Sequence, residues 1–251
     1  MQSKLIKLFA VFLMLGCFAC GSDDDGGMVQ PMPEPEMEPT SLRIGLLAHF
    51  AFEGNADDLS SNAYTGTVVG ATVTADRNGE PNGAYYFDGI DDHINYGNLT
   101  DLALGGAQPY TMAAWVKPEQ LDNPDSRSII ISKFNGGVAA GWYLAINGNA
   151  TVAAYRNVAP WATFGIGAVD WSEYVHVAST YDGTALKVYI NGIEDNSVNF
   201  GTHPNDRTTN VTVGAIYSQN NLVPAFRGNI DEVRIYNRVL EPEELTWLAE
   251  N

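Results

Sequence analysis

The chain has 251 residues, of which 13 are Lys or Arg and 30 are Asp or Glu, so its formal net charge is −17. Hydrophobic residues make up 45% and aromatic residues 11%, which excludes a fully disordered chain. The shortage of basic residues argues against nucleic-acid binding and against adsorption to anionic lipid, since both need clustered Lys and Arg. The acidic balance instead favours a soluble extracellular protein and, as a ligand, a hard cation such as calcium.

The N-terminus has the pattern of a secretory signal. Lys4 and Lys7 begin the chain, and an apolar run follows from Leu8 to Ala19. The stretch from Leu5 to Cys20 is shorter than the roughly 20 residues that span a bilayer as a helix, so a transmembrane anchor is the second interpretation.

Cys17 and Cys20 close this run, each after a small residue. They resemble the lipobox of bacterial lipoproteins, in which a signal peptidase cuts before a Cys that is then acylated. We predict lipidation at Cys20, because the acidic tract from Gly21 to Asp25 resembles the export signal of surface-displayed lipoproteins in some Gram-negative bacteria. Cys17 is the alternative, with Met14 three residues before it. The predicted signal peptide covers 1–19, and the predicted location is the outer membrane, facing the exterior, with no disulfide in the folded part.

Residues 20–41 are predicted to comprise the lipidated Cys and an acidic, Pro-rich tether. Pro31, Pro33, Pro35 and Pro39 alternate with Met and Glu, and repeated Pro favours a stiff, extended chain. Six acids between residues 23 and 38 add self-repulsion, although Asp23–Asp25 fit a merely solvated segment as well. The remaining domain, 42–251, carries a net charge of −13.

From residue 42 onward, short runs of β-branched and aromatic residues are separated by Gly, Asn and Asp, which predicts strands. Asn147-Gly148-Asn149, Asp182-Gly183 and Asn191-Gly192 are hairpin signals, since tight turns need positive φ. The predicted strands are Ile44–Phe52, Thr65–Val73, Ala84–Phe87, His93–Tyr96, Tyr110–Lys117, Ser128–Phe134, Trp142–Ile146, Thr151–Tyr155, Tyr174–Tyr181, Leu186–Ile190, Val198–Phe200, Asn210–Ile216 and Phe226–Asn237.

One helix is predicted over Glu241–Leu248, because Pro242 and the acids around it suit a helix start. Many evenly spaced strands and one helix predict an all-β fold, a two-sheet antiparallel jelly-roll sandwich with a short C-terminal helix.

Five stretches of this domain resemble the concanavalin A-like jelly rolls, and specifically bacterial laminin-G-like domains. In chain order they are His49–Asp58 with Ser60–Asn62, Ala84–Ile94, Thr111–Pro118, Tyr174–Gly183 with Val188–Gly192, and Gly228–Leu240. Tyr174 stands where a Trp is more usual. The family includes lectins, enzymes and adhesion modules, so the resemblance implies the fold and leaves the function open.

The sequence favours a protein without catalytic activity. Glucanases of this architecture carry E-x-D-x-x-E on one strand, and the nearest match here has Asn229 and Arg234 in place of the two Glu. An amide cannot act as the nucleophile and a guanidinium cannot donate the proton. His49 and His176 lie in apolar strands as expected core residues, and His203 lacks an obvious partner. The alternative is a glycan-cleaving enzyme whose carboxylate pair is assembled only by folding.

Two acidic clusters are candidates for a structural calcium ion, which takes six to eight oxygen ligands. In the first, Glu53 and Asp58 follow the opening strand, and Asp231 lies in the closing strand. If these strands pair antiparallel, as the resemblance implies, one ion would join them. The alternative site is Asp88, Asp91 and Asp92. In both clusters the Asp side chains also fit turns in which they accept hydrogen bonds from their own backbone.

Carbohydrate binding is the leading function, because sugars stack their apolar faces on exposed aromatic rings. The predicted ligand-binding residues are Tyr155, Asn157, Trp161 and Trp171, whereas Trp115 and Trp142 fit strand patterns of the core. The predicted partner is a glycan or glycoprotein, with the membrane reached only through the lipid anchor. A protein-binding or adhesion module of the cell envelope is the alternative.

Overall fold

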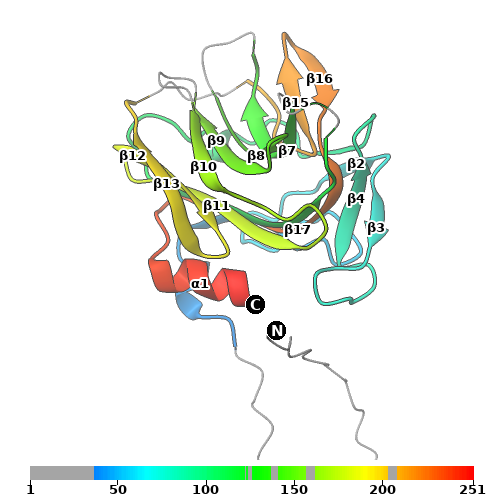
Figure 1. Cartoon of the computed structure of the whole chain (residues 1–251), viewed down its shortest axis with the longest axis horizontal. Coiled ribbons are helices and arrows are strands. Elements are labelled where there is room, and N and C mark those ends of the chain that lie inside the picture. Colours follow the sequence, from blue (N-terminus) through cyan, green and yellow to red (C-terminus); the bar gives the residue numbers. More distant parts are fainter. Residues whose placement is uncertain (1–36, 122, 124–125, 137–140, 157–161, 203–207) are drawn as a thin grey trace, which may run out of the picture. The chain divides into compact units, whose positions relative to one another are not determined.

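Two antiparallel sheets face each other in this computed structural model, which describes residues 37–121, 123, 126–136, 141–156, 162–202 and 208–251 (Figure 1). The predicted jelly-roll sandwich is therefore confirmed. One compact unit covers Glu38–Asn251 and begins ahead of the predicted start at residue 42. The predicted signal peptide, Cys20 and most of the tether lie outside the described residues. No helix in the described part is long and apolar enough to cross a membrane.

The first sheet, called sheet 1, contains eight strands, with β1 (Leu46–Phe50) as a second partner at one end of β17. Its pairing order is β13 (Ile193–Asn199), β12 (Ala185–Ile190), β11 (Val175–Tyr181), β6 (Tyr110–Pro118), β17 (Arg227–Tyr236), β4 (Ala84–Asp88) and β3 (Thr72–Thr74).

The second sheet, called sheet 2, contains seven strands, and a separate hairpin stands beside it. Its pairing order is β10 (Ala162–Ala168), β9 (Thr151–Arg156), β8 (Gly141–Asn147), β7 (Arg127–Phe134), β14 (Thr212–Val213), β5 (His93–Asn95) and β2 (Thr67–Val69). The hairpin consists of β15 (Ala215–Ser218) and β16 (Asn221–Pro224), and short 3-10 turns cover Thr40–Arg43 and Thr100–Leu102.

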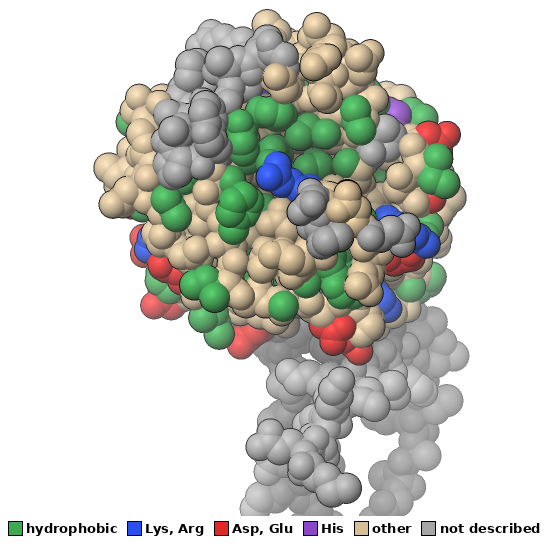
Figure 2. Space-filling view, turned by 45° about the horizontal axis from the view of Figure 1, so that its top comes forward, with side chains coloured by type: hydrophobic (Ala, Val, Ile, Leu, Met, Phe, Trp, Pro, Cys, Tyr) green, Lys and Arg blue, Asp and Glu red, His purple; other side chains and the backbone are tan. Residues whose placement is uncertain are grey.

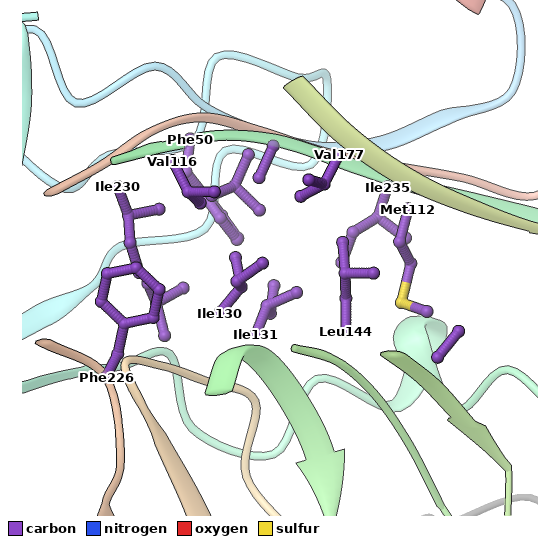
Figure 3. Packing of buried hydrophobic residues seen from close by; sticks show 14 of the residues in the cluster. Phe50, Met112, Val116, Ile130, Ile131, Leu144, Val177, Phe226, Ile230 and Ile235 are labelled. Atoms are coloured by element: carbon purple, nitrogen blue, oxygen red, sulfur yellow. The ribbon is translucent and has the colours of Figure 1, made fainter. Parts of the chain in front are cut away.

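The core fills the space between the two sheets. Alternate residues of each strand point inward, so Met112 and Val116 of sheet 1 meet Ile131 and Leu144 of sheet 2 (Figure 3). All four side chains are fully buried. Trp142 also lies in this core, as predicted, and its indole N–H donates to the carbonyl of Leu102 at 2.9 Å.

Glycines divide two segments that the sequence pattern predicted as single strands. Thr65–Val73 is split at Gly70, so β2 and β3 belong to different sheets. Asn210–Ile216 is split at Gly214, which has a φ of 79° and where a Cβ would lie 2.6 Å from the Phe87 ring.

The sequence pattern missed two strands, β10 and β16, and predicted the helix well. Strand β10 was missed because its Ala- and Gly-rich sequence has no strong β-branched run. Helix α1 (Pro242–Glu250) forms as predicted, with a capping box between Glu241 and Glu244. It packs Leu245 and Leu248 on the outer face of sheet 1.

Strand β17 carries a one-residue bulge at the middle of sheet 1. Its register with β6 shifts between Asp231 and Arg234, and Glu232 has a φ of 50°. Ile230 and Val233 both face the core. The two consecutive acids between them therefore point to the outer face of sheet 1, on the same side as α1.

Charged hydrogen bonds join three other segments to this bulge, namely the loop that carries Arg77, the end of the chain at Asn251, and β1. Arg77 donates to Asp231 at 2.6 Å and to the backbone oxygen of Asn251. The ring of His49 in β1 lies 2.8 Å from Glu232, which also accepts from Arg234 at 3.0 Å. Burial alone would raise the pKa of Glu232, but the His49 hydrogen bond and the nearby cations lower it to about 2.

His176 of β11 is buried beside this network. It borders a cavity of about 120 Å³ under α1, together with Trp115 and Trp247. Burial, reinforced by the charges of Arg77 and Arg234, lowers the pKa of His176 to about 3. Its imidazole is therefore neutral near pH 7, which fits the predicted role of a core histidine.

We predict that His176→Gln makes the free energy of unfolding less dependent on pH between 6.5 and about 3. The folded protein resists protonation of His176 down to about pH 3, whereas the unfolded chain protonates it near its ordinary value of 6.5. Stability from the neutral ring is complete above pH 6.5 and is lost as the pH falls toward 3. The measurement is urea unfolding of both proteins across this range. The stability advantage of the wild type should shrink by up to about 1.4 kcal/mol per pH unit. A constant difference would contradict the assignment.

Candidate functional site

A groove lies on the outer face of sheet 2, away from α1. It has a volume of about 450 Å³, and the β15–β16 hairpin forms one wall. Figure 2 looks onto this side of the molecule, where hydrophobic side chains surround a hollow with a basic side chain at its margin. The described residues that line this aromatic groove are Arg127, Ile129, Phe134, Tyr143, Tyr155, Ile216 and Ala225.

Strand register builds the floor of the aromatic groove. Tyr143 of β8 pairs directly with Tyr155 of β9, and their rings are parallel, with centroids 4.8 Å apart. Phe134 of β7 meets both rings edge-on, at 5.7 Å from Tyr143 and 4.9 Å from Tyr155. Tyr143 is buried, whereas Tyr155 and Phe134 are partly exposed. The next outward residues are Ala145 and Ala153, whose small side chains leave the groove open.

Arg127 stands at the edge of this floor, at the start of β7. Its guanidinium donates to the Tyr143 hydroxyl at 2.6 Å and to the side-chain oxygen of Asn147 at 3.3 Å. The same group lies 5.9 Å from the ring centroids of Tyr143 and Phe164. Burial raises the pKa of Tyr143 to about 12, despite the opposing charge of Arg127, so its phenol is a neutral acceptor.

Two further hollows adjoin the aromatic groove. One, of about 200 Å³, begins beside Phe134 and Ile216 and is lined by amides and hydroxyls, including Asn135, Asn210 and Asn220. The other, of about 700 Å³, shares Arg127 and Ala225 with the groove and extends to the loop around Asp88 and Ile90. The aromatic groove and the larger hollow therefore form one surface of mixed polar and apolar character.

Of the predicted ligand-binding residues, Tyr155 lines the aromatic groove. Asn157 and Trp161 lie outside the described residues. Trp171 is partly buried and packs against the main core, so it does not line the groove.

Sequence reasoning missed Tyr143, Phe134 and Arg127. Alternation could have found Tyr143, because the prediction that Trp142 faces the core already places its neighbour on the opposite face.

Two of the three residues of the first predicted metal site, Asp58 and Asp231, form other contacts. Asp231 is buried against Arg77. Asp58 accepts from the backbone of His49 and Ser60, both at 2.8 Å, and from the Ser60 hydroxyl at 2.6 Å, which fixes the loop after β1. Strands β1 and β17 do pair antiparallel, as expected, but β1 ends at Phe50, before Glu53.

The carboxylates of the alternative metal site lie close together in the structure; they belong to Asp88, Asp91 and Asp92. Within the described ranges this is the one group of three or more acidic, His or Cys ligands whose ligand atoms lie within 4.8 Å of one another. Asp92 accepts from the Asp88 amide at 2.9 Å, and Asp88 accepts from the Ile90 amide at 2.7 Å. These bonds are those of a self-capping turn, and Asp91 is exposed.

The structure is similar to several solved structures, one of which is in complex with a carbohydrate. One is domain 4 of AbnA, a GH43 extracellular arabinanase from Geobacillus stearothermophilus, in complex with arabinotriose. The two share 25% identity and a TM-score of 0.61, over 81% of this chain and 98% of that one.

Two toxin structures share the fold at lower identity. The binding domain of Paraclostridial Mosquitocidal Protein 1 is 14% identical, with a TM-score of 0.67 over 83% of this chain and 52% of that one. A structure of botulinum neurotoxin type C, whose cell entry is described as dependent on interaction with two ganglioside molecules, is 10% identical. Its TM-score is 0.65, over 84% of this chain and 52% of that one. This chain thus spans about half the length of each toxin chain.

No curated protein matches the sequence. Residues 87–246 match the family Laminin_G_3, described as the concanavalin A-like lectin/glucanases superfamily. This match covers more than half of the chain and includes every strand of the aromatic groove from β7 to β10. The chain therefore belongs to the concanavalin A-like lectin/glucanase superfamily.

Proposed function

We propose that this protein binds carbohydrate at the cell surface without cleaving it, and that the sugar lies in the aromatic groove. The observation that carries the proposal is the partly exposed pair of Tyr155 and Phe134 beside the Arg127 guanidinium. Aromatic rings offer apolar faces for sugar C–H groups, and nearby amides and cations read the hydroxyls. The likeness to an arabinanase domain that holds arabinotriose supports the same ligand class.

The charge distribution supports binding rather than hydrolysis. Glycosidases place two carboxyl groups on either side of the scissile bond. The described residues that line the aromatic groove include no Asp or Glu. Asp231 and Glu232 of β17 face the opposite side of the molecule, where Arg77, His49 and Arg234 engage them.

We expect Tyr155→Ala to weaken glycan binding by about tenfold or more, because truncating a central aromatic anchor removes most of its contact area. A glycan array identifies the ligand, and calorimetry of wild type and variant gives the ratio. Ile193→Ala is the matched control, since Ile193 is 73% exposed on β13 of sheet 1. Equal affinities of wild type and Tyr155→Ala, or an array without any hit, would contradict glycan binding in this groove.

The N-terminal pattern supports display on the outer membrane through a lipid at Cys20, with the acidic tether as spacer. We expect full-length Cys20→Ser to lose acylation and to leave the membrane fraction, while Cys17→Ser keeps both. Metabolic labelling with a fatty acid, followed by fractionation, measures this. Label that disappears only in Cys17→Ser would move the lipid to the alternative site, and label retained in both variants would contradict lipidation at this pair.

A calcium ion at Asp88, Asp91 and Asp92, the alternative site predicted from the sequence, is a further proposal, supported by the proximity of the three carboxylates. A bound ion stabilises the fold according to its concentration and affinity, by about 2.7 kcal/mol at one hundred times Kd. We expect calcium to raise the melting temperature of the wild type, and Asp91→Asn to remove the effect. Asp91→Asn leaves the carboxylates that cap the turn in place. A melting temperature that is identical with calcium and with EDTA would contradict the site.

A further inference from the structure

Arg127 gives the aromatic groove a positive charge that no carboxylate among the described residues neutralises. In the part of the chain that the structure describes, most arginines lie within hydrogen-bonding distance of a carboxylate or close to it, namely Arg43, Arg77, Arg227, Arg234 and Arg238. Two do not. Arg156 is fully buried inside the sandwich, 3.3 Å from the centroid of the Tyr181 ring. Arg127 is exposed at the groove.

The described neighbours of Arg127 orient its guanidinium without neutralising it. Its partners among the described residues are the neutral oxygens of Tyr143 and Asn147 and the rings of Tyr143 and Phe164. A guanidinium has five N–H donors, and these two hydrogen bonds use two of them. The remaining donors belong to the two terminal nitrogens, whose geometry matches the two oxygens of a carboxylate.

The position of Arg127 favours a ligand longer than one sugar. It lines both the aromatic groove and the larger adjoining hollow. A sugar unit beside Arg127 therefore has space for neighbouring units on both sides. In the adjoining hollow, Asp88 accepts hydrogen bonds from its own turn, and Arg227 pairs with Glu119 at 2.7 Å. Because Glu119 compensates the charge of Arg227, Arg127 is the cation that is left to bind the ligand among the described residues lining this hollow.

We propose that the groove selects oligosaccharides that carry a carboxylate, and that Arg127 binds this carboxylate. The inference rests on the proposed carbohydrate function and adds the class of sugar. The acidic surface of the domain does not prevent it, because repulsion from distant charges is screened over about 8 Å at physiological salt. The guanidinium of Arg127, which lies at the groove, therefore determines the preference for acidic over neutral sugars.

The test compares matched acidic and neutral sugars by calorimetry. One pair is trigalacturonate and its fully methyl-esterified form, and the other is 3′-sialyllactose and lactose, so that uronates and sialylated glycans are tested separately. We expect the wild type to bind the acidic member of at least one pair about tenfold more tightly, the usual gain from a hydrogen bond to a charged group. Arg127→Gln should abolish this ratio, and Arg127→Lys, which keeps the charge, should retain part of it.

Two controls separate this inference from the function on which it rests. Arg43→Gln removes an arginine that is paired with Glu38 and remote from the groove lining, and it should keep the wild-type ratio. Tyr155→Ala should weaken both members of a pair. A wild type that binds acidic and neutral sugars equally, with Tyr155→Ala still harmful, overturns the carboxylate preference and leaves the carbohydrate function standing. A wild type that binds none of the four sugars and no glycan on an array overturns both.

Discussion

The bulge in β17 is the constraint on which the arrangement of sheet 1 depends. Because one extra residue is inserted there, Asp231 and Glu232 emerge on the same face, and each reaches a different segment. Glu232 engages His49 of β1, while Arg77 joins Asp231 to the end of the chain after α1. Removing one partner of such a buried pair costs more than the pair contributes, since a charge is then left without compensation. The network therefore fixes which segments lie on the outer face of sheet 1.

This arrangement leaves sheet 2 to provide the exposed binding surface. The outer face of sheet 1 is occupied by α1, by Leu42 and by the charged network. The outer face of sheet 2 carries instead an open strip of Tyr, Phe and Ala on β7, β8 and β9. The pairing of Tyr143 with Tyr155 stacks two rings without any loop having to hold them. A binding floor built on paired strands is rigid, so a ligand does not have to order it on binding.

The sequence predicted the fold better than the site. Hairpin signals such as Asn191-Gly192 and the helix start at Pro242 are local, and both appear where expected, with φ positive at both turn residues. The sequence predicts Tyr155 as a site residue, because it lies among other aromatic and polar residues between Asn147 and Trp171. Arg127 and Phe134 were not, since their proximity to Tyr155 depends on strands of one sheet lying side by side. The metal-ligand prediction for Asp231 has the same origin. Its partner Arg77 is 154 residues away in the sequence, so the pair is visible only in the folded chain.

Mapping the bound ligand on the outer faces of the two sheets tests directly whether the glycan binds in the aromatic groove. The measurement is an NMR titration of the isotope-labelled protein with the glycan that binds best on an array, with backbone and aromatic signals assigned. We expect the perturbed signals to belong to β7, β8, β9 and the β15–β16 hairpin, with the Tyr143 and Tyr155 rings among the largest changes. Perturbations confined to α1 and the residues around Trp115, with the Tyr155 ring unchanged, would place the ligand on the opposite sheet and contradict binding in the aromatic groove.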